Sequence, residues 1–323
     1  MFAAYAESTD PQRPLDGLRL GDRPSPEVPD GWVKVDVKAA ALNHHDVWSL
    51  RGVGLPADRL PMILGCDAAG VDADGNEVVV HAVVSDPHWR GDETLDPQRS
   101  LLSERHQGTL AEQVVVPRRN VIRKPAGLSF EEAACLPTSW LTAYRMLFTQ
   151  SGLKPGDAVL VQGAGGGVAT ALISLGGAAG FRVFVTSRDA AKRERAVALG
   201  ACEALEPGAR LPTRVDAVME TVGAATWSHS IKSLRPGGTL VISGTTSGAQ
   251  PSDVELTRVF FLQLRVQGST MGTRDELQRL VELLDLTGRR PVIDRVLPLD
   301  QAKAGFTAMI EGDVFGKIVC IPG

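Results

Sequence analysis

The stretch "VLVQGAGGGVATAL" at 159–172 decides the fold of this chain. The apolar run at its start is typical of a buried strand, and the glycines after it are typical of a tight turn. The apolar residues that follow have the composition of a helix. A strand, a glycine turn and a helix in this order predict the first unit of a parallel α/β sheet.

Downstream of this stretch, strand patterns alternate with helix patterns. The strands are expected at "FRVFVTS" (181–187), "VDAVMET" (215–221) and "GGTLVISG" (237–244), with helices at "DAAKRERAVALG" (189–200) and "ATWSHSIKSLR" (225–235) between them. Such an alternation predicts a doubly wound parallel sheet, and the nearly continuous apolar strands predict burial on both faces.

Upstream, the first 118 or so residues have a different texture. Short alternating runs such as "WVKVDVKAAAL" (32–42) and "NEVVVHAVV" (76–84) predict a mainly β region. From about residue 119 helical patterns begin, and Ser129 with Glu132 three positions later predicts a helix N-terminus.

Composition excludes several classes of function. The 34 Lys and Arg residues stand against 38 Asp and Glu, a net charge of −4, so no basic field favours a nucleic acid or an anionic membrane. No apolar run has the length of a membrane span, and the N-terminal stretch turns polar too early for a secretory signal. The four cysteines show no C-x-x-C spacing, which argues against a zinc knuckle and a disulfide framework. We therefore expect a cytoplasmic protein.

The glycine turn has the context that a dinucleotide-binding turn requires. A literal G-x-G-x-x-G is absent, and Ala164, Gly166 and Ala169 take its three positions. Gly166 would let backbone N–H groups approach a pyrophosphate, and Ala169 would allow close packing of the helix on the strand. The alternative is an ordinary glycine-rich turn, but the flanking alternation favours a cofactor. The predicted contacts in this turn are Ala164, Gly166, Gly167 and Val168.

The end of the next strand indicates which dinucleotide is bound. An acidic residue there would bond the ribose hydroxyls of NAD, whereas this chain has Ser187 and Arg188, followed by Lys192. A hydroxyl, a guanidinium and an ammonium suit a 2′-phosphate, so we predict NADP(H). The alternative is that these cations only decorate a helix surface, and Asp189 counts against the phosphate.

Several segments together resemble the medium-chain dehydrogenase/reductase superfamily, in which a GroES-like domain flanks a Rossmann domain. They are "AALNHHDVWSLRG" (40–52), "LPMILGCDAAG" (60–70), "GTLAEQVVVP" (108–117), "SFEEAACLPTSWLTAYRML" (129–147), "GLKPGDAVLVQGAGGGV" (152–168), "LRPGGTLVISG" (234–244) and "FGKIVCIPG" (315–323). The resemblance implies an α/β fold in which a mainly β GroES-like catalytic domain, 1–118 completed by 269–323, flanks a Rossmann NADP-binding domain, 119–268.

The same resemblance bears on zinc. Zinc-dependent members carry Cys, His and Cys as metal ligands where this sequence has Asn43, Cys66 and Thr138. Neutral Asn and Thr are poor zinc ligands, and the segment 86–107, where many members carry a four-cysteine lobe, has no cysteine. We expect His44 and His45 on an extended strand, where adjacent side chains point to opposite faces and do not converge on one ion. No bound metal is therefore predicted, the alternative being a metal at Cys66 and Asp67.

The resemblance also implies roles for the residues near the position where zinc-dependent members bind the metal. His44 would contact the cofactor pyrophosphate, His45 would belong to a proton relay, and Asn43 or Thr138 would donate a hydrogen bond to a substrate carbonyl. The alternatives are structural histidines held by hydrogen bonds and, for Asn43, a buried side chain that bonds the backbone. Asp46 would hold its neighbours by hydrogen bonds. Large aromatic residues, Trp48, Trp140 and Phe260, would wall a substrate pocket, the alternative being that they belong to the core. Further cofactor contacts are expected at Thr142, Ser243, Gly244, Thr245, Gly268, Ser269, Thr270 and Lys317.

The resulting hypothesis is an NADPH-dependent, zinc-independent reductase of quinones or α,β-unsaturated carbonyl compounds. The alternatives are a divergent zinc-dependent alcohol dehydrogenase and a non-catalytic NADPH-binding protein. The apolar segment at 253–268, "DVELTRVFFLQLRVQG", together with the resemblance, predicts a homodimer formed edge to edge by two Rossmann sheets.

Overall fold

The computed structural model describes residues 1–323, which form two compact units. The first consists of residues 1–141 and 272–323, and the second of residues 142–271. None of the helices combines the length and the apolar character needed to cross a bilayer.

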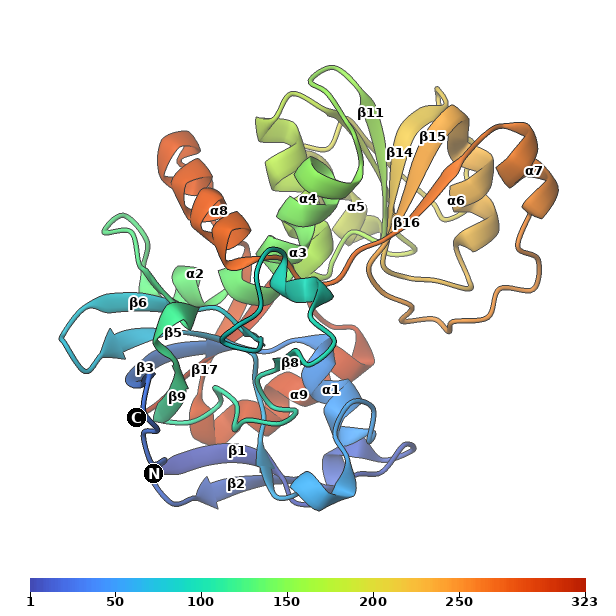
Figure 1. Ribbon diagram of the computed structural model, residues 1–323. Helices are drawn as coiled ribbons and strands as arrows, with labels where there is room; N and C mark the ends of the chain where they lie inside the picture. The colour runs from blue at the N-terminus through green and yellow to red at the C-terminus, as the bar shows by residue number, and fades with distance from the viewer. The chain divides into compact units, whose positions relative to one another are not determined.

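The first unit is built on a largely antiparallel sheet around the long strand β3 (Trp32–Ala41), in which only β17 and β18 pair parallel (Figure 1). Val33, Val35 and Val37 of β3 face the core, while the residues between them are less buried, as the alternating sequence predicts. The sheet order is β10 (Val121–Arg123), β6 (Glu77–Val80), β5 (Asp67–Asp72), β3, β18 (Lys317–Ile321) and β17 (Ile293–Pro298), and β9 (Gln113–Pro117) also pairs with β3.

The two ends of the chain complete this unit together. Strand β18 comes from the C-terminus and pairs antiparallel with β3, which comes from the first 41 residues. Phe306 of α9 (Ala302–Glu311) is fully buried in the same core cluster as Val47 and Leu50. Smaller pieces are a sheet of β2 (Leu18–Asp22), β1 (Phe2–Ala6) and β4 (Met62–Ile63), a pair of β7 (Val83–Val84) and β8 (Ser100–Leu101), helices α1 (His44–Leu50), α2 (Phe130–Ala134) and α8 (Arg274–Thr287), and short turns η1 (Pro14–Asp16), η2 (Ala57–Arg59), η3 (Glu93–Leu95), η4 (Arg118–Asn120) and η7 (Leu299–Gln301).

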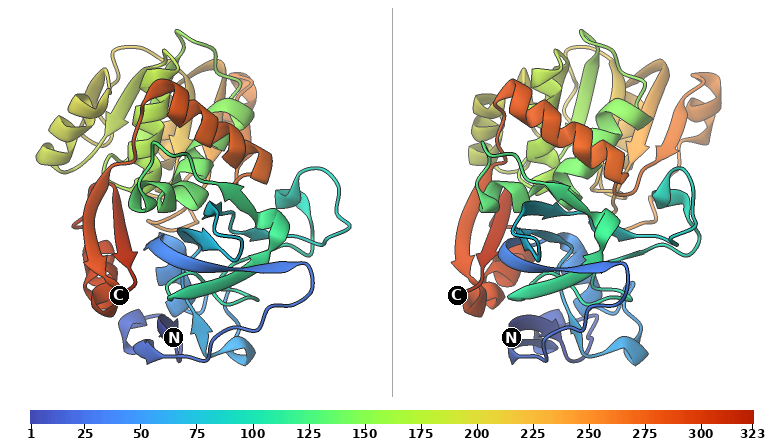
Figure 2. Two further views of the ribbon diagram at one scale, coloured as in Figure 1. Left: turned by 90° about the vertical axis from the view of Figure 1, so that its left-hand side faces the viewer. Right: turned by 60° about the vertical axis from the view of Figure 1, so that its left-hand side comes forward.

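The second unit is the doubly wound sheet that the alternation predicted. Its six strands are all parallel, in the order β13 (Glu203–Leu205), β12 (Arg182–Thr186), β11 (Ala158–Gln162), β14 (Val215–Glu220), β15 (Leu234–Ile242) and β16 (Arg265–Gly268). The order reverses between β11 and β14, which is the position where such sheets bind ligands at the carboxyl ends of their strands. Figures 1 and 2 show α4 (Gly167–Ala178) and α5 (Ala190–Leu199) on one face and α6 (Trp227–Ser233) with α7 (Leu256–Phe261) toward the other.

The boundary between the units differs from the expected one at 118/119. Residues 119–141 belong to the first unit, because β10 pairs with β6 and α2 packs against β3 and β5. Ser129 begins α2, as predicted, with its Oγ accepting from the Glu132 N–H at 3.2 Å. After α2, the chain continues through the π-helical turn η5 (Leu136–Trp140), α3 (Leu141–Tyr144) and a second π-helical turn η6 (Arg145–Gln150).

Candidate active site

The turn from β3 into α1 is organised by Asp46. Asn43 has an extended backbone (φ −133°, ψ 156°), and its N–H donates to Asp46 Oδ2 at 2.8 Å. The other carboxylate oxygen, Oδ1, accepts from the Gly65 N–H at 3.1 Å, which fixes the residue before Cys66. The predicted structural role of Asp46 is confirmed by these bonds. Burial raises the pKa of Asp46 to about 6, against the opposing effects of His45 and of the Asn43 N–H.

His44 and His45 do not lie on a strand, so that expectation was wrong: they are the first two residues of α1. The capping of the helix by Asn43 and Asp46 ends β3 at Ala41. His44 is exposed to solvent, and its pKa is lowered first by desolvation and then by the charges of Lys317 and Arg51.

His45 has one acidic neighbour that the sequence did not suggest. Its Nε2 lies 3.9 Å from Glu104 Oε1 and has no hydrogen-bond partner, although it is shielded from solvent. Glu104 is held in place because its Oε2 accepts from the Leu101 N–H at 2.9 Å. An imidazole beside a fixed carboxylate can hold and release a proton, which is the chemistry expected of a relay.

A buried lysine occupies the centre of this region. Lys317, at the start of β18, donates to Leu42 O at 2.7 Å, Asn43 Oδ1 at 2.7 Å and Asp67 Oδ2 at 3.0 Å. The Asn43 amide group donates in turn to Ala41 O at 3.2 Å and to Asp67 Oδ2 at 2.9 Å. Lys317 is 3% exposed and Asp67 is 0% exposed. We call Asn43, Asp67 and Lys317 the ammonium cluster.

The ammonium cluster changes two expectations. Because all three N–H bonds of the Lys317 ammonium already have acceptors inside the first unit, the structure does not place Lys317 as a cofactor contact. The Asn43 amide likewise has partners for its oxygen and for its nitrogen, so it is not a free donor for a substrate carbonyl. Both side chains instead fix the position of the Asp67 carboxylate.

Two polar atoms beside the cluster lack a partner. They are Asp67 Oδ1 and Thr138 Oγ1, both shielded from solvent. Thr138 lies in η5, which packs against β5, the strand that Asp67 begins. Short π-helical turns are frequent at functional sites, and a buried hydroxyl without a partner is costly unless a ligand or water completes it. Of the predicted carbonyl donors, Thr138 is therefore the one still available.

The residues at the three positions where zinc-dependent members carry their ligands, Asn43, Cys66 and Thr138, do not fit a tetrahedral zinc site. Cys66 is fully buried, and its thiol donates to Leu102 O at 3.2 Å. Burial, and then the charges of Asp46 and Asp67, raise the pKa of this thiol well above its usual value, so it stays protonated. Asn43 already has partners, and the fixed cation of Lys317 would repel a second cation. The structure has no group of three or more His, Cys, Asp or Glu side chains arranged to hold a metal ion.

The three aromatic residues predicted to wall a substrate pocket lie in different surroundings. Trp140 is completely buried in the core, which contradicts its expected place at a pocket wall. Phe260 lies on α7 of the second unit and is 70% exposed. Trp48, on α1, is half-buried, with the Arg51 guanidinium 4.9 Å from its ring centre. Only Trp48 shares an element with the histidines and is partly open to solvent.

In the second unit, the glycine turn has the geometry of an anion site. Gly163 adopts φ +86°, which favours glycine, and Gly166 is the N-cap of α4. The N–H groups of Gly167, Val168 and Ala169 are in the first turn of this helix, where no intrahelical acceptor exists. A Cβ at Gly166 would meet no atom within 4 Å, so the absent side chain leaves open space in front of these donors. These residues fit the pyrophosphate of a dinucleotide.

The residues after β12 suit a phosphorylated ribose. Arg188 is exposed, and Ser187 Oγ accepts from the Asp189 N–H at 3.2 Å. Asp189 caps α5 by accepting from the Lys192 N–H at 3.2 Å, so its carboxylate is used locally. Arg193, which we did not predict as a site residue, braces the turn by donating to Ser187 O at 2.7 Å.

The remaining predicted cofactor contacts follow the carboxyl ends of β15 and β16. Ser243 donates its N–H to Glu220 O at 2.9 Å, and Ser269 donates its N–H to Ile242 O at 2.8 Å. Ser269 Oγ is shielded from solvent and has no partner. Because the strands are parallel, the following residues lie at the same sheet edge as the glycine turn: Ser243, Gly244, Thr245, Gly268, Ser269 and Thr270. Thr142, the first residue of the second unit, is buried.

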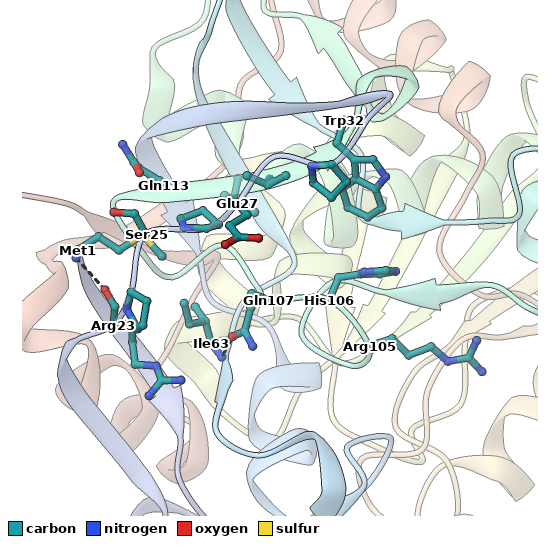
Figure 3. A pocket seen from close by; sticks show the side chains of 15 residues that line it. Met1, Arg23, Ser25, Glu27, Trp32, Ile63, Arg105, His106, Gln107 and Gln113 are labelled. Atoms are coloured by element: carbon teal, nitrogen blue, oxygen red, sulfur yellow. Dashed lines mark hydrogen bonds between the residues drawn. The ribbon is translucent and has the colours of Figure 1, made fainter.

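A cavity of about 510 Å³ lies elsewhere in the first unit (Figure 3). It contains none of the predicted site residues. Trp32 and His106 form a tilted ring pair in its wall, with centroids 5.0 Å apart. The other lining residues are Met1, Arg23, Pro24, Ser25, Pro26, Glu27, Pro29, Ile63, Arg105, Gln107, Gln113, Val114 and Val115.

Comparison with known proteins matches both parts of the chain. Residues 29–126 match the family described as alcohol dehydrogenase GroES-like domain, and residues 167–285 match the family described as zinc-binding dehydrogenase. A zinc-type alcohol dehydrogenase-like protein of Schizosaccharomyces pombe is 29% identical, with 91% of this chain and 92% of the relative covered. An acryloyl-coenzyme A reductase of Sulfurisphaera tokodaii is 26% identical, with 96% and 98% covered. A solved structure described as an NAD-dependent alcohol dehydrogenase is 35% identical, covers 100% of both chains and has a TM-score of 0.91.

The ammonium cluster yields a prediction about stability. In Lys317→Met, the Asp67 carboxylate would stay buried without its cation, so we expect the free energy of unfolding to fall by about 3–5 kcal/mol. The double variant Lys317→Met with Asp67→Asn removes both charges and should recover at least half of this loss. Urea unfolding followed by circular dichroism measures both. Lys303→Met, at an exposed position of α9, is the control and should match the wild type. A Lys317→Met variant as stable as this control would contradict the ion pair.

Proposed function

Because the chain belongs to the medium-chain dehydrogenase/reductase superfamily of oxidoreductases, we propose that it reduces α,β-unsaturated carbonyl compounds or quinones with NADPH and without a catalytic zinc. The observation that carries this proposal is the ammonium cluster. The Lys317 ammonium is hydrogen-bonded to Asn43 and Asp67. These two residues are therefore already engaged and are not available as ligands of a zinc ion. The acryloyl-coenzyme A reductase among the relatives supports an activated double bond as the substrate class.

The charge that develops during reduction favours this substrate class. NADPH, when bound, supplies a hydride to the electron-poor carbon of the substrate. A hydrogen bond stabilises an oxyanion less strongly than a zinc ion stabilises it. A site without zinc therefore suits reactions whose product delocalises the negative charge, such as an enolate or a hydroquinone. An unactivated alcohol or ketone offers no such delocalisation.

The available donors take separate roles in this proposal. Thr138 Oγ1 has no partner in the structure and would donate to the carbonyl oxygen of the substrate, where the negative charge develops. His45 would give the proton that completes the reduction, and Glu104 would stabilise its protonated form. Asn43 is a positioning residue, because its amide nitrogen donates to Asp67 and its amide oxygen accepts from Lys317.

Replacement of Thr138 tests the carbonyl contact. Thr138→Val keeps the shape of the side chain and removes the hydroxyl, so kcat/KM for a small enone should fall by about 100-fold. Thr307→Val, which removes a hydroxyl from α9, should leave kcat/KM unchanged. The assays follow NADPH oxidation in the presence of a chelator. Wild-type turnover that is lost in chelator and restored by zinc would contradict the proposal, as would full activity of Thr138→Val.

The choice of NADPH rests on Ser187 and Arg188 at the end of β12, where no acidic side chain is present to bond the ribose hydroxyls. Exposed Arg188 would bind the 2′-phosphate through its guanidinium, and Asp189 does not oppose this because it caps α5.

Arg188→Ala should therefore raise KM for NADPH at least about tenfold and leave KM for NADH unchanged. Arg182→Ala, at the opposite end of the same strand, serves as the matched control and should change neither constant. The measurement is steady-state kinetics with each dinucleotide at a fixed enone concentration. A wild-type preference for NADH would overturn the assignment.

We also propose a homodimer through the edge of the second unit. Strand β16 pairs with β15 and has no neighbour on its other side, and all four of its residues are exposed. Phe260 and Phe261 on α7 are 70% and 76% exposed, which is unusual for aromatic residues that stay in water.

The four cysteines are free thiols, which supports a reducing compartment, the cytoplasm.

Size-exclusion chromatography with light scattering tests the dimer. The wild type should elute with twice the mass of the 34.3 kDa chain, because the apolar edge of one copy would cover that of the other. Val266→Arg puts a charge on β16 and should shift the protein to monomer. Val197→Arg, on exposed α5 outside the edge, should stay dimeric. A monomeric wild type would contradict the proposal.

A further inference from the structure

A buried carboxylate that the proposed reaction does not use lies under the cofactor edge of the second unit. Glu220, the last residue of β14, is fully buried. Its Oε1 accepts from the N–H groups of Val222 at 2.7 Å and Gly223 at 2.9 Å. Its Oε2 accepts from the hydroxyls of Thr226 at 2.8 Å and Ser230 at 2.6 Å. Four donors thus stabilise one negative charge close to where an anionic cofactor is proposed.

The Glu220 carboxylate determines which group donates and which accepts in a chain of hydrogen bonds. Because the Ser230 hydroxyl donates to Glu220, its oxygen accepts from Gln162 Nε2 at 3.0 Å. Gln162 Oε1 accepts from Thr186 Oγ1 at 2.6 Å, and Thr186 Oγ1 accepts from the Gly163 N–H at 3.4 Å. A carboxylate only accepts and an N–H only donates, so every proton of this chain has one placement.

The second proton of the Gln162 amide group is also assigned. Gln162 Nε2 lies 3.0 Å from His229 Nδ1, and His229 Nε2 lies 2.9 Å from Ala209 O. Since a carbonyl oxygen only accepts, the His229 proton is on Nε2, and Nδ1 is free to accept from Gln162. The amide of Gln162 therefore has partners on all sides and holds one orientation.

The chain connects three turns at the carboxyl edge of the sheet. Gly163 begins the glycine turn, and Thr186 directly precedes Ser187, a proposed contact of the 2′-phosphate. Val222 and Gly223 form the turn after β14, where Gly223 has φ +92° and a Cβ would lie 2.9 Å from Thr245 Cα. Each turn carries predicted cofactor contacts or touches one, whereas the side chains of the chain lie beneath them in the core.

We propose that Glu220, acting through Ser230, Gln162 and Thr186, is a positioning group that sets these three turns for dinucleotide binding. This inference rests on the dinucleotide site proposed above. Networks of buried hydrogen bonds that are completely satisfied hold one arrangement, and a turn fixed before binding loses less conformational entropy when the ligand arrives.

Variants of the chain separate positioning from plain stability. Gln162→Met keeps the volume of the side chain and removes the carbonyl oxygen and the NH2 group of the amide. Ser230→Ala removes the hydroxyl that links Gln162 to Glu220. Both should raise the Kd for NADPH about five- to tenfold, which corresponds to one lost hydrogen bond. The control, Ser233→Ala, removes a bond of similar length on the same helix, from Ser233 Oγ to His229 O at 2.8 Å, and should leave the Kd unchanged. The Kd is measured by the fluorescence of bound NADPH, and Tm is measured in parallel.

Thr186 supplies a rescue test. Thr186→Val should weaken binding as Gln162→Met does, whereas Thr186→Ser retains the hydroxyl and should bind like the wild type. Combining Thr186→Val with Ser230→Ala should raise the Kd by less than the product of the two single effects, because both break the same chain. This coupling would be absent if the two residues acted independently.

The outcomes distinguish the inference from the function it rests on. If the wild type binds NADPH and the variants bind equally well with lowered Tm, the chain is only structural and the positioning role is overturned. If the wild type binds neither NADPH nor NADH, the proposed function is overturned together with this inference. Weaker binding by Gln162→Met and Ser230→Ala, with Tm values close to that of Ser233→Ala, supports the inference.

Discussion

The ion pair between Lys317 and Asp67 is the constraint on which the first unit and its site depend. Lys317 begins β18, Asp67 begins β5, and Asn43 follows the end of β3, so three neighbouring strands of the sheet are joined at one end by a single cation. An ammonium buried as deeply as that of Lys317 is tolerated because an opposite charge lies beside it and all its N–H bonds have acceptors. The C-terminal segment therefore contributes to the chemistry of the site as well as to the sheet.

The same cation determines what the site can do. With Lys317 fixed, the Asn43 amide is saturated and Asp67 keeps one oxygen without a partner. Cys66 remains a neutral thiol, because burial and the nearby carboxylates of Asp46 and Asp67 raise its pKa. The polar side-chain groups still without a hydrogen-bond partner on neighbouring elements then include the Thr138 hydroxyl and the His45 imidazole, which are the groups we propose for the substrate. This set donates hydrogen bonds and protons, and it is chemically distinct from a set of thiolates and imidazoles around zinc.

The second unit follows the same physical rule with another carboxylate. Glu220 is buried and satisfied by four donors, and the hydrogen bonds that begin there reach the glycine turn. In both units the residues that would touch a ligand stand on turns or in the first turn of a helix, and buried polar groups hold these segments from below. Geometry of this kind limits how far a turn can shift when a ligand is absent.

Sequence patterns predicted what is encoded locally. The glycine turn at 163–166, the parallel alternation and the cap at Ser129 are signals within a few residues, and the structure contains all three. The helical start at His44 was also a local signal, Asn43 followed by Asp46 three positions later, but the apolar alternation before it favoured a continued strand. Lys317 and Asp67 are 250 positions apart, and no local pattern announces such a pair. The contact of His45 with Glu104 and the pairing of β10 with β6, which moved the boundary of the first unit, are long-range in the same sense.

In the proposed function, a fixed ammonium and hydrogen bonds take the place of a catalytic metal. The most direct test of this proposal is the metal content of active enzyme, measured by mass spectrometry of protein produced in zinc-supplemented medium and assayed for NADPH-dependent reduction of an enone. We expect turnover in protein that holds far less than one zinc per chain, with no correlation between zinc content and rate. One tightly held zinc per chain, with a rate that rises in proportion to it, would contradict zinc-independent reduction.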